Sequence, residues 1–143
     1  SYSAEGYLTG IVENIDNTEY SSTSLTYENG DITSISSKMN GLENKFIYEP
    51  GEESSTYHLP CLGLLEIHPL TFHIEALYAG LLGKDPRHFT IRSCPAGSND
   101  EKTIYSYEFD KKGNPSRMIC QTTYAGGQAS YYPYTRNISV SFE

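Results

Sequence analysis

The 143-residue chain has no tryptophan, few basic residues and no long apolar run. Ten basic residues against eighteen acidic ones give a net charge of −8, which repels a phosphate backbone and excludes nucleic acid as the expected partner. The same charge disfavours direct binding to anionic membrane surfaces. No apolar stretch approaches the ~20 residues that cross a bilayer as a helix. What remains is a chain of single-domain size, residues 1–143.

Motifs for common catalytic chemistry are missing as well. There is no GxSxG nucleophile elbow, and Gly126-Gly127 is followed by neither a helix pattern nor a lysine that would hold phosphate. The three cysteines, Cys61, Cys94 and Cys120, include no CxxC pair. Buried free thiols are the prediction, and a Cys61–Cys94 disulfide is the alternative, which requires an oxidising compartment.

The chain is rich in tyrosine, with thirteen Tyr and five Phe, and these aromatics recur beside turn residues. Residues 24–36 contain the clearest hairpin, because Asn29-Gly30 is a preferred type I′ turn between branched and aromatic residues. A two-residue loop places Tyr27 opposite Ile32, with Leu25 on the same face. Thr26 and Thr33 then occupy the more polar face. Gly6 fits a turn that needs positive φ.

Further strands are expected along the chain. Residues 43–49 read as a strand that Pro50-Gly51 stops, and Tyr105, Tyr107 and Phe109 alternate with polar residues. Residues 118–124 form the expected partner strand, and alternation at 138–142 predicts a closing strand. Turn residues about every ten positions are typical of an all-β sandwich, barrel or rolled sheet.

A central segment, residues 57–95, breaks this rhythm with an apolar, proline- and histidine-rich composition. It carries one helical stripe with a possible cap at Thr71 and an end at Gly83; the stripe is Ile74, Leu77, Tyr78, Leu81 and Leu82. We therefore expect an all-β fold, an antiparallel meander of about eight strands rolled into an open or partial barrel. Hairpin strands occupy 1–56 and 102–143, and the insert 57–95 supplies one short helix that covers the sheet.

The hairpin pattern, the segment Leu81-Leu-Gly-Lys-Asp-Pro-Arg-His-Phe89 and the later Tyr107-Glu-Phe-Asp-Lys-Lys-Gly-Asn-Pro115 carry a resemblance. Over roughly residues 2–142 the chain resembles a Bacteroidetes family of secreted lipoproteins of unknown function with a porin-like antiparallel fold. The hairpins also resemble the tyrosine–aspartate repeats of large bacterial surface proteins. The resemblance implies export to the periplasm or cell surface, and membrane contact only through a lipid anchor that this chain does not contain. It supplies no catalytic residues and no cofactor.

Metal and acid–base chemistry find weak candidates in the insert. Its possible metal ligands do not show closely paired spacing, and no metal site is predicted from them; they are His58, Cys61, His68, His73, His88 and Cys94. Glu66 and Glu75 are the acids embedded in apolar sequence, and we expect both to point outward.

Exposed aromatics support a binding role better. Tyr131, Tyr132 and Tyr134 surround Pro133, and tyrosine rings offer flat apolar faces on which sugars stack. Alternatively, these rings only stabilise the sheet. We expect a non-catalytic exported protein that binds a glycan, peptide or envelope partner. The alternatives are a structural protein that acts through strand pairing and a metal- or carboxylate-dependent hydrolase.

Overall fold

The computed structural model describes residues 1–54, 80–98, 100–112, 115–124 and 134–139. Within these residues the fold is all-β, as predicted. The eight strands are β1 (Gly10–Ile15), β2 (Thr18–Glu28), β3 (Asp31–Met39), β4 (Leu42–Ser54), β5 (His88–Pro95), β6 (Glu101–Phe109), β7 (Pro115–Tyr124) and β8 (Tyr134–Ser139).

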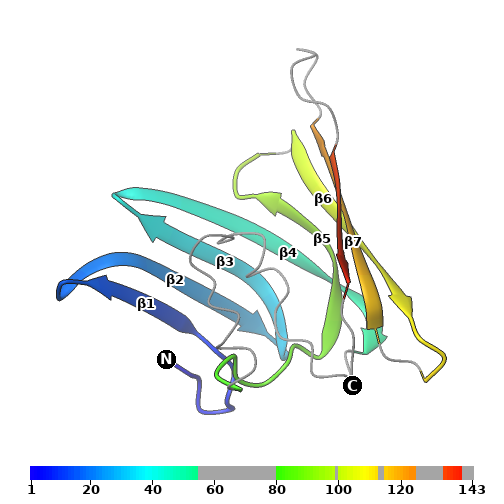
Figure 1. Ribbon diagram of the computed structural model, residues 1–143, viewed down its shortest axis with the longest axis horizontal. Helices are drawn as coiled ribbons and strands as arrows, with labels where there is room; N and C mark the ends of the chain where they lie inside the picture. Colours follow the sequence, from blue (N-terminus) through cyan, green and yellow to red (C-terminus); the bar gives the residue numbers. More distant parts are fainter. Residues whose placement is uncertain (55–79, 99, 113–114, 125–133, 140–143) are drawn as a thin grey trace.

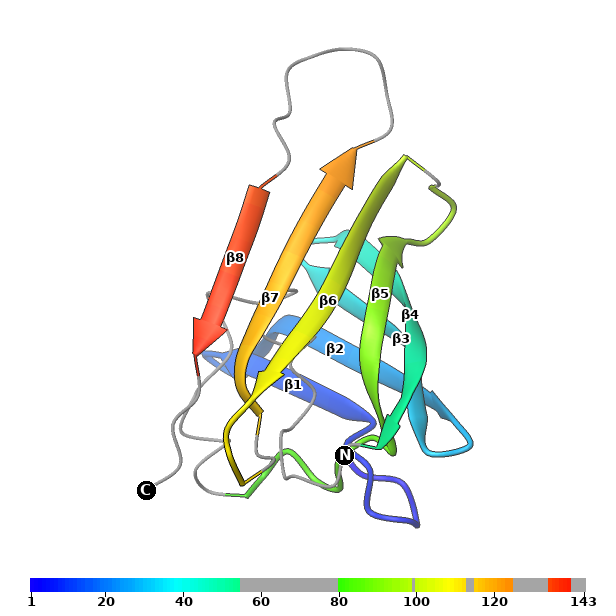
Figure 2. The same ribbon diagram turned by 90° about the vertical axis from the view of Figure 1, so that its right-hand side faces the viewer.

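The strands form one antiparallel sheet in which each strand pairs with its neighbours in the chain. The sheet bends strongly, so that β5 to β8 turn across β1 to β4 (Figure 1). Figure 2 shows the same bend from the side, with β5 to β8 in front of the first four strands. The strand order begins at β1 and ends at β8 without closing into a barrel. The predicted open meander is confirmed.

Tight turns explain why consecutive strands pair. Asn29-Gly30, between β2 and β3, has φ angles of 54° and 90°, as a type I′ turn requires. Tyr27 lies opposite Ile32, as predicted, and Leu25 lies opposite Ile35. A register shift between Thr26 and Tyr27 lets all four residues keep to one face of the hairpin. Asn40-Gly41 repeats the turn between β3 and β4, with φ angles of 51° and 77°.

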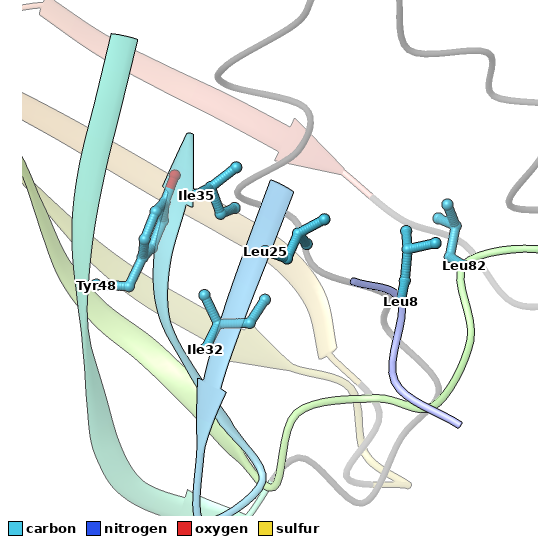
Figure 3. Close-up of a cluster of buried hydrophobic side chains, with 6 residues drawn as sticks. All are labelled: Leu8, Leu25, Ile32, Ile35, Tyr48 and Leu82. Atoms are coloured by element: carbon cyan, nitrogen blue, oxygen red, sulfur yellow. The ribbon is translucent and has the colours of Figure 1, made fainter. Parts of the chain in front are cut away.

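The larger apolar cluster lies on β2, β3 and β4 and is closed by two residues from outside the sheet (Figure 3). Its members are Leu8, Leu25, Ile32, Ile35, Tyr48 and Leu82, each at most 9% exposed. Burying one such side chain stabilises the fold by roughly 1.5–3 kcal/mol. A smaller cluster on β6 and β7 contains Tyr105, Met118 and Cys120. Leu8 and Leu82 therefore fasten the amino-terminal segment and the Gly80–Arg87 segment to the sheet.

Buried hydroxyl groups of the sheet form hydrogen-bonded pairs near the apolar cluster of β6 and β7. Ser93 Oγ lies 2.8 Å from Tyr105 Oη, and Thr103 Oγ1 lies 2.8 Å from Thr122 Oγ1. Both pairs are buried, so each hydroxyl gains a partner that compensates for lost water. The pairs join β5 to β6 and β6 to β7 through side chains as well as through the backbone ladder.

The expectation that Pro50-Gly51 stops the fourth strand is wrong. β4 continues to Ser54, and the register shifts on both sides of Pro50 absorb the irregularity. A methyl group at Gly51 would lie 2.6 Å from Ile91 Cγ2, so glycine permits β5 to pass closely. Here the pair marks a bulge inside a long strand, and proline tolerates such a position.

The predicted insert 57–95 is wrong at its carboxyl end, because His88–Pro95 forms β5 between β4 and β6. Phe89, Thr90 and Ile91 are strand-forming residues that the surrounding prolines and histidines obscured. Most of the predicted helix falls on residues 55–79, outside the described residues. Residues 80–82 form a turn, and Gly83 has a φ of 72°.

Of the three cysteines, Cys94 carries a free thiol and Cys120 is fully buried. Cys61, the other half of the alternative disulfide, lies outside the described residues. Among the described residues, no helix has the length and apolar character needed to cross a membrane.

Candidate functional site

A solvent-open pocket of about 610 Å³ lies where three chain segments meet at one end of the sheet. The amino-terminal segment, the β2–β3 turn and the Gly80–Arg87 segment line it, through Glu5, Tyr7, Tyr27, Asn29, Gly30, Lys84 and Arg87. No strand supplies the whole site. Its geometry therefore depends on how the three segments are held together.

Backbone contacts hold the amino-terminal segment against the Gly80–Arg87 segment. Tyr7 and Gly83 form an isolated β-bridge, and the Lys84 N–H donates to the Gly6 carbonyl at 2.8 Å. A methyl group at Gly83 would lie 2.7 Å from Gly6 O and 2.9 Å from Leu8 N. Only glycine allows the two backbones to approach so closely, and this approach places Lys84 beside Tyr7.

A second set of contacts holds the β2–β3 turn. The Arg87 N–H donates to the Gly30 carbonyl at 3.0 Å, and Arg87 Nη1 donates to the Asn29 carbonyl at 3.4 Å. Next to them, the buried Asp31 carboxylate accepts a 2.8 Å hydrogen bond from the His88 N–H. Its other oxygen lies 2.8 Å from His88 Nδ1. The turn is thus fixed to the start of β5.

Two tyrosine rings form the aromatic part of the pocket. The ring centroids of Tyr7 and Tyr27 lie 4.8 Å apart at 31°. Tyr7 is 4% exposed, whereas Tyr27 is half-buried, and both residues line the pocket. Lys84 Nζ lies 4.9 Å from the Tyr7 ring centroid, a distance at which a cation is attracted to the ring. Tyr7 therefore supports the site, and Tyr27 offers the surface that a ligand would touch.

The absence of a side chain at Gly30 allows Arg87, the second cation of the pocket, to lie close to Tyr7. A methyl group at Gly30 would lie 2.6 Å from Arg87 Cδ and 2.8 Å from Tyr7 Oη. Arg87 and the Tyr7 hydroxyl consequently lie side by side over this glycine. Lys84 lies beside the ring and Arg87 beside the hydroxyl of one tyrosine.

The pocket carries two positive charges, Lys84 and Arg87, although the net charge of the chain is −8. Lys84 and Arg87 are exposed, and within the described part of the chain no carboxylate forms an ion pair with either. Arg92 and Arg117, by contrast, lie 3.2 Å from Glu49 and Glu108. Among the described residues that line the pocket, Glu5 is the one acidic residue. The arrangement is suited to binding through a ring face and two cations.

Most of the candidate metal-ligating and acid–base residues of the insert lie outside the residues that the structure describes. His58, Cys61, Glu66, His68, His73 and Glu75 lie outside the described residues. His88 interacts with Asp31, and Cys94 lies opposite Ile47 in the sheet. Among the residues that the structure describes, no group of three His, Cys, Asp or Glu side chains is placed to hold a metal ion.

The described part of the chain includes one of the three predicted ligand tyrosines. Tyr131 and Tyr132 lie outside the described residues, and Tyr134 begins β8 opposite Thr122. Figure 2 shows β8 beginning at the end of the sheet opposite the amino-terminal segment and Gly80–Arg87. The pocket was not predicted from the sequence, because Tyr7, Tyr27 and Arg87 are far apart in the chain.

Comparison with known proteins identifies a family. Residues 1–117 match the family model described as "Domain of unknown function (DUF4595) with porin-like fold". The crystal structure of a porin-like protein from Bacteroides uniformis ATCC 8492 is similar, with a TM-score of 0.76 and 24% identity over 96% of this chain. The present chain spans 54% of that protein's chain, so the likeness concerns the fold of about half of it. No curated protein matches the chain.

Proposed function

We propose that this chain, which belongs to the DUF4595 family of domains of unknown function with a porin-like fold, is a non-catalytic envelope protein that binds a saccharide. The half-buried Tyr27 ring in an open pocket carries this proposal. Sugars stack their CH groups on such rings, and the neighbouring tyrosine hydroxyl, lysine and arginine supply hydrogen bonds. A pocket of about 610 Å³ is within the range of small-molecule sites.

The proposed location rests on two supports. The similar structure is a porin-like protein from a Bacteroides species, and the sequence resembles exported lipoproteins. We propose a periplasmic or cell-surface location for the native protein. Cell fractionation with an antibody to the chain tests it, and recovery in the cytoplasmic fraction alone would contradict it.

Calorimetry and thermal shift against soluble oligosaccharides test the binding function. A saccharide at a hundred times its Kd stabilises the fold by about 2.7 kcal/mol, which raises Tm by several degrees. Tyr27→Ala should weaken binding at least tenfold, measured well below the Tm of the variant. Tyr20→Ala is the matched control, because Tyr20 lies on the same strand but does not line the pocket.

Failure of every saccharide to bind would overturn the proposal. So would binding that Tyr27→Ala leaves unchanged. In that second case Tyr131, Tyr132 and Tyr134 become the binding platform to substitute next, since they are the aromatic cluster predicted from the sequence.

A second candidate function is assembly through the free edge of β1. Within the described part of the sheet no strand pairs with the outer side of β1. Ile11, Val12 and Ile15 on this strand are 36%, 60% and 51% exposed. Ser1 exchanges hydrogen bonds with Gly10 at the start of this edge, and the apolar part that follows favours strand addition. A second copy of the chain is the partner that we propose for it.

A further inference from the structure

The pocket places two cations on one tyrosine, and nothing in the described residues neutralises them. Lys84 Nζ lies 4.9 Å from the Tyr7 ring centroid, and Arg87 Cδ lies next to the Tyr7 hydroxyl above Gly30. The Tyr7 side chain is therefore the spacer between the two charges. Both cations line the same pocket.

Among the described residues, Arg92 and Arg117 form ion pairs with carboxylates, whereas Lys84 and Arg87 do not. The chain has eighteen acidic and ten basic residues, so a surface cation has many possible carboxylate partners. Arg92 and Arg117 each have one within 3.2 Å. Arg87 instead directs Nη1 to a backbone carbonyl at 3.4 Å, which uses one of its five N–H donors.

We propose that the ligand of this pocket is an acidic saccharide, whose carboxylate or sulfate lies between Lys84 and Arg87 while its ring lies against Tyr27. This inference rests on the proposed saccharide-binding function and specifies its ligand class. The planar guanidinium fork of Arg87 matches the paired oxygens of a carboxylate or sulfate, and Lys84 adds a point charge. Glu5 on the wall of the same pocket repels a second acidic group, which favours saccharides with neutral units beside the charged one.

Isothermal titration with three sets of oligosaccharides of equal length tests the inference. One set carries hexuronate units, one carries sulfate esters, and one is neutral, all at 50 mM and 300 mM NaCl. We expect the acidic sets to bind at least tenfold more tightly than the neutral set, and this preference to shrink at high salt. The relative affinity of the first two sets identifies the acidic group as carboxylate or sulfate.

Two substitutions locate the anion. Arg87→Gln and Lys84→Gln remove the charge but keep a polar side chain. Each should reduce binding of the acidic sets at least tenfold and binding of the neutral set much less, because the glutamine amide still donates hydrogen bonds. Lys45→Gln is the control, because Lys45 is exposed on β4 and does not line the pocket. Circular dichroism and Tm establish that each variant is folded; if Arg87→Gln is not, Lys84→Gln alone decides.

The outcomes separate this inference from the function on which it rests. Equal binding of acidic and neutral saccharides overturns the acidic ligand and leaves saccharide binding standing. An acidic preference that survives both substitutions also overturns it, because the anion then lies elsewhere. No binding of any set overturns the proposed function itself.

Discussion

Two glycines in identical Asn-Gly turns show how one residue serves both the hairpin and the pocket. Gly30 and Gly41 both have positive φ, but only Gly30 is crowded, by Arg87 and Tyr7. Gly41→Ala should cost about 1–2 kcal/mol of unfolding free energy from backbone strain alone. Gly30→Ala should cost a further 1–3 kcal/mol or so, since the methyl group displaces two side chains. Urea unfolding of both variants measures the difference.

Equal losses at the two turns would contradict the close approach over Gly30. Binding provides an independent readout, because Gly41→Ala leaves the pocket intact whereas Gly30→Ala moves Arg87. At this scale the sequence was sufficient for the turn itself, since Asn29-Gly30 requires positive φ whatever lies nearby. It was insufficient for the crowding, because Arg87 arrives from a segment 57 residues further along the chain.

At the scale of elements, alternation predicted the strands that have one wet face. Tyr105, Tyr107 and Phe109 lie on β6 as expected, and residues 118–124 lie on β7. Local composition failed where tertiary contacts override it: β4 passes through Pro50-Gly51, and β5 lies inside the predicted insert. The pocket was beyond prediction, because Tyr7, Tyr27 and Lys84 meet only after the sheet has formed.

Asp31 joins two of these elements, since its carboxylate holds the first residue of β5 beside the β2–β3 turn. Asp31→Ala leaves the His88 N–H without its acceptor and should lower the unfolding free energy by about 1–3 kcal/mol. Glu28→Ala is the matched control. The exposed Glu28 lies opposite Asp31 in the register, and its substitution removes the same charge. Equal Tm values for the two variants would show that the tie contributes nothing.

Gly83 joins another pair of elements, the amino-terminal segment and the Gly80–Arg87 segment. Gly83→Ala places a methyl group within 2.9 Å of two backbone atoms, so the segments must separate. Gly80→Ala is the control, because Gly80 also has positive φ but nothing lies within 4 Å of its added methyl group. We expect faster amide hydrogen exchange at Lys84, whose N–H donates to the Gly6 carbonyl, in Gly83→Ala than in Gly80→Ala. Equal exchange in both variants would contradict the docking role of Gly83.

For the whole molecule, the two candidate functions depend on salt in opposite directions. An acidic ligand at Lys84 and Arg87 is bound more weakly as salt rises, because screening reduces the attraction. Association of two chains, each with a net charge of −8, is favoured as salt rises, because screening reduces their repulsion. Salt therefore separates the two candidate functions without any substitution.

The free β1 edge supplies the substitution for the second of them. We expect the sedimentation coefficient to rise with protein concentration, and more steeply at 500 mM than at 50 mM NaCl. Val12→Lys should abolish the rise, because a charged side chain on an edge strand opposes pairing with another strand. Leu42→Lys is the control, since Leu42 is 74% exposed but lies at the β3–β4 turn. A rise that both variants keep, or both lose, would place the contact elsewhere, and no rise would leave the pocket as the remaining functional site.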